Sequence, residues 1–168
     1  MPENIRRHTE TVTKIAVFLA ERLRSAGEPV NVPLVEAAGL LHDIAKYPAL
    51  STHEHHGMAG KRIIEKKGYP EVARVISMHA VPEIMCYPNL SWEEQIVNYA
   101  DRRVNHDKIV TLDERFAYLR RTYPGHRTED EWNSAEKIYK ELEKKIFSMI
   151  HLNASRLEEY VNEKYAAG

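Results

Sequence analysis

Apolar residues recur at steps of three and four along nearly the whole of this 168-residue chain, and alternating runs of β-branched residues are almost missing. A period near 3.6 residues is typical of helices that bury one face, whereas strands alternate with a period of two. Within residues 4–26, for example, Val12, Ile15 and Leu19 lie on one stripe, and Gly27 follows as a typical helix end. The pattern predicts an all-α fold.

Start and stop signals divide this pattern further. Asn31 is a typical N-cap residue and predicts a helix that begins after it and ends before Pro48. Ser91, Thr111 and Thr128 are each followed three residues later by a glutamate, which is the signature of a capping box. About seven helices result, over residues 4–26, 32–47, 54–67, 70–80, 91–106, 112–123 and 128–166, the last being one helix or two that break near Asn153.

Length and composition favour a single domain over residues 1–168. The net charge of −1 gives no broad basic field, so we expect no nucleic-acid partner. Cys86 is the only cysteine, which excludes an intramolecular disulfide and fits a reducing compartment. No apolar run approaches the roughly 20 residues of a membrane span, and no signal-peptide pattern precedes the first helix. We therefore expect a cytoplasmic protein without membrane association.

The stretch "EAAGLLHDIAKYP", residues 36–48, places polar residues where a buried stripe is expected. His42 and Asp43 lie beside the inward face that Ala38 and Leu41 form. Their side chains are about 100° apart around a helix, so both can point into one cavity at the edge of the core. Lys46 follows one turn later, on the same wall of that cavity.

The same anomaly recurs on other predicted helices. His8, His56, His79 and Asp101 each lie three or four residues from apolar residues of a buried stripe. A buried carboxylate without a partner is strongly unfavourable, so a positive charge must compensate it. Imidazole and carboxylate ligands suit Fe, Mn, Co, Ni or Zn, and the lack of thiolates argues against a purely structural zinc. Six such ligands exceed the needs of one tetrahedral ion and fit two ions bridged by a carboxylate.

A structural alternative compensates each residue separately. A single histidine on an apolar stripe is more often a hydrogen-bonded core residue than a ligand. Asp43 would then pair with Lys46 or cap a helix, and Asp101 would pair with Arg102 or Arg103. This alternative needs a separate partner for each of the six polar residues, which lie on five helices. The joint pattern therefore favours the metal site.

At "LLHDIAK" the chain resembles the HD-domain superfamily of metal-dependent phosphohydrolases, over most of residues 5–105. The family's ordered pattern of an early His, the His-Asp pair and a late Asp maps onto His8, His42, Asp43 and Asp101. The resemblance implies a helical bundle of the HD-domain type, with a metal-binding core at about residues 5–105. The remaining residues, about 110–168, form a helical C-terminal extension.

A dinuclear branch of this family has two further histidines, the first followed four residues later by a glycine. Here "HGMAG" supplies His56 with Gly60, and "VISMHA" supplies His79. Within the branch, "GLLHDIAK" and "HHGMAG" are similar to enzymes that hydrolyse symmetrical dinucleoside tetraphosphates. The "AVPE" after His79 departs from those enzymes, so the resemblance leaves the substrate open.

The resulting hypothesis is hydrolysis of a phosphate ester or anhydride in a nucleotide. Asp43 would bridge two metal ions, with His8, His42 and Asp101 completing one shell and His56 and His79 the other. A hydroxide between the ions would attack phosphorus, while Lys46 balances charge on the phosphoryl oxygens. The alternative role of Lys46 is to complement a helix C-terminus.

Other residues near the predicted cleft are assigned to the substrate or the entrance. Arg102 and Arg103 would reach a second phosphate, although a solvated basic face is the favoured explanation of these residues. His53 and His55 would line the entrance, and Tyr47, Tyr69 and Tyr87 flank the cleft.

A second hypothesis belongs to a different class of protein. The chain would be a nucleotide-sensing or partner-binding module that keeps the fold with little turnover. Its acidic, lysine-rich C-terminal helix would then serve as an interaction face or as the seam of a homodimer.

Overall fold

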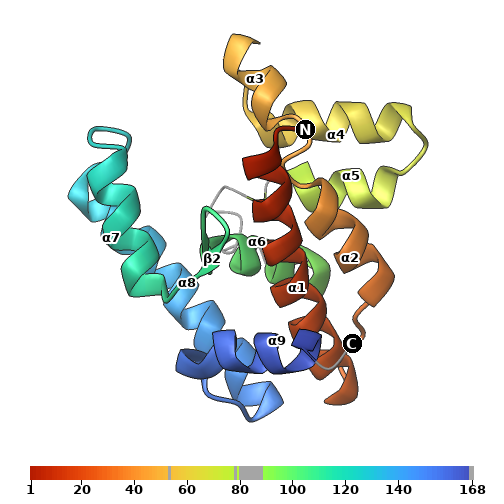
Figure 1. Cartoon of the computed structure of the whole chain (residues 1–168), viewed down its shortest axis with the longest axis vertical. Coiled ribbons are helices and arrows are strands. Elements are labelled where there is room, and N and C mark those ends of the chain that lie inside the picture. The colour runs from red at the N-terminus through yellow and green to blue at the C-terminus, as the bar shows by residue number, and fades with distance from the viewer. Residues whose placement is uncertain (53, 78, 80–88, 167–168) are drawn as a thin grey trace.

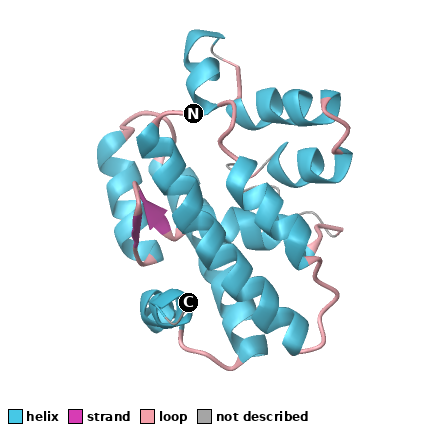
Figure 2. Ribbon diagram, turned by 45° about the vertical axis from the view of Figure 1, so that its right-hand side comes forward, coloured by secondary structure: helices cyan, strands magenta, loops and turns pink. Residues whose placement is uncertain are grey.

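The computed structural model describes residues 1–52, 54–77, 79 and 89–166, and it confirms the predicted all-α fold (Figure 1). Figure 2 shows helices along almost all of the described chain, and the strands form one short antiparallel pair, β1 and β2. In chain order the elements are α1 (Glu3–Ser25), α2 (Val32–Leu41), α3 (Lys46–Thr52), α4 (His56–Lys66), α5 (Pro70–Ser77), α6 (Trp92–Arg102), β1 (Val104–Asn105), β2 (Lys108–Ile109), α7 (Leu112–Thr122), α8 (Glu129–Ile150), the 3₁₀ helix η2 (Ala154–Arg156) and α9 (Leu157–Ala166).

The described residues form nine α-helices rather than about seven. One additional helix is α3, which occupies most of the predicted loop after Pro48. The other arises because the stretch after Thr128 is divided into α8 and α9. The three predicted capping boxes, at Ser91, Thr111 and Thr128, are all present.

Helix α1 is the central element of the bundle and contacts α2, α6, α8 and α9. The predicted stripe of Val12, Ile15 and Leu19 is completely buried. The approach of α1 to α2 is especially close at Gly39, where an added Cβ would lie 2.8 Å from Thr13 Oγ1. Because any side chain at position 39 would force the helices apart, this glycine sets their spacing.

The predicted helix 32–47 ends early, at Leu41. Residues 42–45 form turns in which Ile44 N–H donates to the Leu41 carbonyl and Lys46 N–H donates to the Asp43 carbonyl, each spanning three residues. Pro48 does not follow a helix but lies in the first turn of α3, where a helix needs no N–H from that residue. The turns redirect the chain directly at His42 and Asp43.

The predicted helix 91–106 also ends early, at Arg102. A two-stranded antiparallel hairpin follows, with Val104 paired to Ile109 and Asn105 paired to Lys108. His106 stands in its turn with a left-handed backbone, at a φ of 57°. A helix cannot continue through that conformation, so the predicted helix could not have included residue 106.

The C-terminal stretch breaks near Asn153, one of the two outcomes predicted for it. His151 ends α8 with a φ of 54°, and the Asn153 side chain accepts from Ser155 N–H at the start of η2. Helix α9 then packs back against α1, where the rings of Phe18 and Tyr160 stack with their centroids 6.2 Å apart (Figure 1). The C-terminal extension is therefore part of the same packed core.

None of the helices in the described part of the chain combines the length and the apolar character that a membrane crossing needs. Cys86, His53 and Tyr87 lie outside the described residues.

Candidate metal centre

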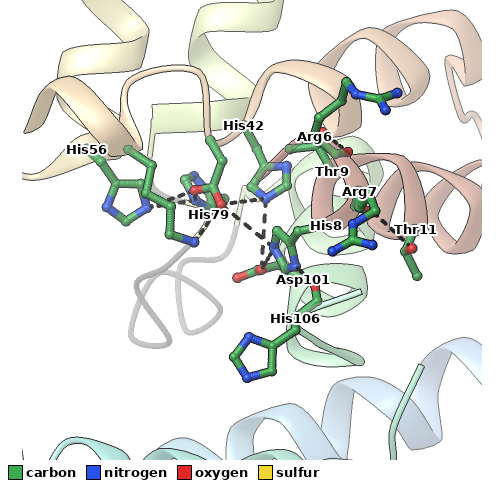
Figure 3. Close-up of polar contacts among 12 residues, drawn as sticks. Arg6, Arg7, His8, Thr9, Thr11, His42, His56, His79, Asp101 and His106 are labelled. Carbon is green, nitrogen blue, oxygen red and sulfur yellow. Dashed lines mark hydrogen bonds and ion pairs between the residues drawn. The ribbon is translucent and has the colours of Figure 1, made fainter. Parts of the chain in front are cut away.

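The structure brings together all six residues predicted as metal ligands, from five separate parts of the chain (Figure 3). They come from α1 (His8), the turn after α2 (His42 and Asp43), the first residue of α4 (His56), the segment after α5 (His79) and α6 (Asp101). All are buried except His56, whose side chain is 26% exposed. A half-buried ligand at the rim gives the cluster one side that faces the solvent.

Main-chain carbonyl groups orient three of the four imidazoles. In each case Nδ1 lies 2.7 Å from a main-chain carbonyl oxygen. His8 contacts the carbonyl of His106, His42 contacts that of Gly39, and His79 contacts that of Ile76. Because a carbonyl oxygen only accepts, each Nδ1 carries the proton and donates it. The unprotonated Nε2 atoms therefore face the cluster, which is the arrangement typical of metal-bound histidines.

The two oxygens of Asp43 face different pairs of histidines. Oδ2 lies 3.7 Å from His8 Nε2 and 3.6 Å from His42 Nε2. Oδ1 lies 3.3 Å from His56 Nε2 and 3.6 Å from His79 Nε2. The cluster thus divides into two groups that share Asp43, and the ligand atoms of each group are close enough to hold one ion.

Asp101 adds a second carboxylate to the first of these groups. Its Oδ1 lies 3.1 Å from His8 Nε2 and 3.9 Å from His42 Nε2. The group around His8 therefore offers two imidazoles and two carboxylates, whereas the group around His56 offers two imidazoles and one carboxylate.

A close approach of α4 to the end of α5 brings the second pair of histidines together. A Cβ on Gly57 would collide with the Ser77 carbonyl oxygen, so only glycine fits there. The Nε2 atoms of His56 and His79 consequently lie 3.1 Å apart. Gly60, the glycine that carried the family resemblance, is less constrained, because a Cβ there would lie 3.4 Å from Ile76 Cδ1.

Both ion pairs of the structural alternative are present. Lys46 Nζ lies 2.6 Å from Asp43 Oδ2, and Arg102 Nη1 lies 2.6 Å from Asp101 Oδ2. These two ion pairs do not satisfy every polar atom of the cluster. Asp43 Oδ1 and His42 Nε2 are buried and form no hydrogen bond with any described residue. Leaving such atoms unpaired is costly. A divalent cation would satisfy both atoms, so the residues present fit a metal.

The protonation states also suit metal binding. Burial lowers the pKa of His42 to about 4 and that of His56 to about 4, so both rings are neutral at pH 7. Burial alone would raise the pKa of Asp43, but the rings of His42 and His79 and the Lys46 ammonium hold it below its ordinary value. Neutral imidazoles and an ionised carboxylate are the forms that bind metals.

The prediction that Arg103 contacts the substrate is corrected by the structure. Arg103 is 2% exposed, its Nη1 lies 2.9 Å from Glu143 Oε2, and its Nε donates to the Val110 carbonyl oxygen. These contacts tie the hairpin to α8 and turn the guanidinium away from the cluster. Arg102, one residue earlier on α6, remains beside Asp101 and lines the cavity there.

A cavity of about 650 Å³ opens beside the cluster and is lined by Asp43, Lys46, His56, His79 and Asp101. Its opposite wall comes from α7 and the start of α8, through residues that include Phe116, Leu119 and Trp132. The sequence left the role of this extension open, because the spacing of apolar residues does not show which cavity a helix borders.

Two other contributors to the site were missed from the sequence. Gly39 and Gly57 set the helix spacing, and a glycine inside a helical pattern next to a candidate ligand is a signal that could have been used. The carbonyl group of His106 orients His8, and no side-chain pattern reports a main-chain contact of this kind.

Comparison with known proteins shows one family and several relatives, two of which are described here. A family model described as HD domain matches residues 5–105. The chain is 29% identical over 149 residues to a Picrophilus torridus protein named tRNA (cytidine(56)-2'-O)-methyltransferase, covering 81% of this chain and 40% of that one. It is 31% identical over 126 residues to an uncharacterized protein of Methanocaldococcus jannaschii, covering 67% of this chain and 73% of that one. The chain thus spans less than half the length of the first relative. No match to a solved structure was found.

Proposed function

The chain belongs to the HD-domain family, and we propose that it is a phosphohydrolase that uses two divalent metal ions to cleave a phosphate ester or anhydride of a nucleotide. Membership implies the superfamily of metal-dependent phosphohydrolases; the dinuclear centre and the nucleotide substrate are our proposal. The observation that carries it is the Asp43 carboxylate, whose two oxygens face two separate pairs of imidazoles.

In this proposal His8, His42, Asp101 and Asp43 Oδ2 hold one ion, while His56, His79 and Asp43 Oδ1 hold the other. When bound, such ions supply Lewis acidity, which makes water a nucleophile near neutral pH and neutralises phosphoryl oxygens. Fe, Mn, Co, Ni and Zn all accept this ligand set. The carbonyl groups behind three of the imidazoles keep the ligand atoms in place as the substrate enters.

Lys46 and Arg102 are the cations that we assign to the substrate. The Lys46 side chain is 45% exposed and its ammonium touches Asp43 Oδ2, so a change of rotamer would carry it to an oxygen of a bound phosphate. Arg102 is held beside Asp101 at the wall of the cavity. Both would balance the negative charge that builds up on the phosphoryl group.

The first experiment is metal analysis by mass spectrometry on protein purified without chelators. We expect close to two transition-metal ions per chain in the wild type, and loss of both in Asp43→Asn. Asp113→Asn, on the exposed start of α7, is the matched control and should retain them. About one ion would restrict the centre to His8, His42, Asp43 and Asp101, and none after reconstitution would refute it.

The second experiment is phosphate release from a panel of nucleotides with added manganese, cobalt or iron. Activity that is lost in Asp43→Asn and kept in Asp113→Asn supports the hydrolase. If no nucleotide is hydrolysed with any of these metals, the hydrolase is refuted even when metal is bound.

One observation favours the binding module as a second candidate. The relative whose name gives an activity is called a methyltransferase, and this chain matches only 40% of it. In that protein the matching part need not be the domain that its name describes. A chain that binds metal and nucleotide without phosphate release would support this alternative. The net charge of −1 favours a small nucleotide over RNA as the ligand in either case.

Location and assembly are further proposals. We propose the cytoplasm, because a single cysteine fits a reducing compartment. We also propose that the charged face of α8 forms a homodimer. Light scattering at twice the chain mass of 19.5 kDa would support the dimer, and the monomer mass at micromolar concentration would refute it.

A further inference from the structure

Arg115 occupies an unusual position between two cavities. It lines the 650 Å³ cavity beside the metal cluster and also a second cavity of about 610 Å³ that contains His8. Lys46, Leu50 and Tyr123 line both cavities as well, so the two cavities adjoin at these side chains. Arg115 belongs to α7, beyond the part of the chain that matches the family model.

The guanidinium of Arg115 is only partly satisfied. Nη1 donates to Asn105 Oδ1 over 3.0 Å, and the group stacks on the Tyr118 ring at 5.6 Å. Its Nε is buried and makes no hydrogen bond to any residue that the structure describes. Burial lowers the pKa of Arg115, and Asp101 is the group that most opposes this effect. The guanidinium therefore lies within electrostatic reach of the metal cluster.

Three other arginines near the cluster or on the same helix differ from Arg115 because each has a carboxylate partner. Arg102 pairs with Asp101, Arg103 with Glu143 and Arg120 with Glu136. Arg115 forms no ion pair within the described residues. A partly buried cation without an anion is costly, unless a ligand supplies the anion.

We propose that Arg115 binds a second phosphate group of the substrate, next to the phosphate that is cleaved. A guanidinium presents its N–H groups as a planar fork that matches two phosphate oxygens, and Nε and Nη2 of Arg115 make no hydrogen bond to any described residue. The inference rests on the proposed function. It makes residues beyond 105 part of substrate selection, and it favours substrates with two neighbouring phosphates over simple monoesters.

The test compares the binding of methylenediphosphonate and methylphosphonate by calorimetry, on metal-loaded protein. Their P–C bonds resist hydrolysis, and the pair differs only in the second phosphoryl group. We expect the wild type to prefer the diphosphonate, and Arg115→Gln to reduce that preference roughly 10-fold or more, as expected for a lost charge-assisted contact. Arg115→Lys, which keeps the charge, should restore part of it.

Arg121→Gln is the matched control. Arg121 lies on the same helix, and its guanidinium also stacks on the Tyr118 ring, at 6.0 Å. It is not among the described residues that line the two cavities. It should keep the wild-type preference. Metal content must be equal in all variants. A loss of diphosphonate binding at equal metal content is then not caused by misfolding.

Two results would overturn the inference: a wild type without a preference for the diphosphonate, or an Arg115→Gln protein that keeps it in full. Because binding is measured without turnover, these results are independent of the hydrolase test. A protein that binds through Arg115 but releases no phosphate from any nucleotide would refute the hydrolase alone. A hydrolase whose preference is unchanged in Arg115→Gln would refute the subsite alone.

Discussion

The imidazole of His8 donates from Nδ1 to the carbonyl oxygen of His106, 2.7 Å away and 98 residues later in the chain. His106 offers that carbonyl because its backbone is left-handed at the turn of the β1–β2 hairpin. The orientation of a candidate metal ligand on α1 thus depends on the backbone conformation of one residue after α6.

This contact predicts different effects for two substitutions at position 106. His106→Val introduces a β-branched residue that disfavours a positive φ, so the carbonyl should shift and metal affinity should fall about 10-fold. His106→Gly keeps the backbone conformation and should bind metal as the wild type does. Competition with a chelator of known affinity would measure both. Equal affinities in the two variants would show that the carbonyl does not matter.

His56→Ala should reduce the metal content from two ions per chain to one. His56 contributes only to the group that also contains His79, whereas His8, His42 and Asp101 lie on the other side of Asp43. The residue is half-buried at the start of α4, so its truncation should disturb the core little. Metal analysis after gel filtration measures the result. Loss of both ions would indicate a single, shared binding site.

Gly57→Ala and Gly60→Ala should have opposite effects although they lie on one helix. A Cβ at Gly57 collides with the Ser77 carbonyl oxygen, so the free energy of unfolding should fall by about 1–3 kcal/mol. A Cβ at Gly60 meets ordinary contacts, and an alanine favours the helix by up to about 1 kcal/mol. Urea unfolding of both proteins measures this. Gly57→Ala should also lose one metal ion, because the His56–His79 pair opens.

Lys46→Met should separate metal binding from catalysis. The Lys46 ammonium neutralises Asp43 Oδ2, and a bound cation would be repelled by it. Its removal should leave metal affinity unchanged or higher, while phosphate release falls, by about 10-fold or more if the ammonium stabilises the transferred phosphoryl group. Metal titration and steady-state kinetics on the same preparation provide the measurement. Full activity in Lys46→Met would assign Lys46 to charge balance in the metal-free protein.

The metal-free protein should lose stability as the pH falls from 6.5 to 4. Burial lowers the pKa values of His42 and His56 to about 4 in the folded chain, whereas both titrate near 6.5 when unfolded. In that range the unfolded chain binds protons that the folded chain does not, so the free energy of unfolding falls by roughly 1–3 kcal/mol per ring. Above pH 6.5 these two groups contribute no pH dependence.

Urea unfolding with a chelator present, at several pH values, would check this expectation. A free energy of unfolding that stays constant between pH 7 and pH 4.5 would contradict the prediction.

Local signals in the sequence predicted much of the fold. The three capping boxes and the Asn31 N-cap are all found where expected, because side chain and backbone satisfy each other within four residues there. The family assignment is likewise confirmed over the expected residues, 5–105. The helix ends at Leu41 and Arg102 were not predicted, because tertiary packing and a left-handed residue decided them.

In the candidate site, too, local patterns were predicted from the sequence and long-range contacts were not. Periodicity placed six polar residues on buried faces, and the structure brings those six side chains together. Arg103 was assigned to the substrate because it follows Asp101 in sequence, yet adjacent helix residues point about 100° apart. Arg115 carries no signal in the sequence, because the approach of α7 to the cluster follows from long-range packing.

The packing of α9 against α1 has a consequence for the order in which the chain can fold. Helix α1 is synthesised first, but the ring of Phe18 gains its stacking partner only when Tyr160 has been made. Until then the growing chain lacks the cover that α9 gives to this part of α1, and incomplete chains that expose apolar surface are prone to aggregate. Truncation before residue 157 should therefore give an aggregation-prone protein even though every proposed metal ligand is present.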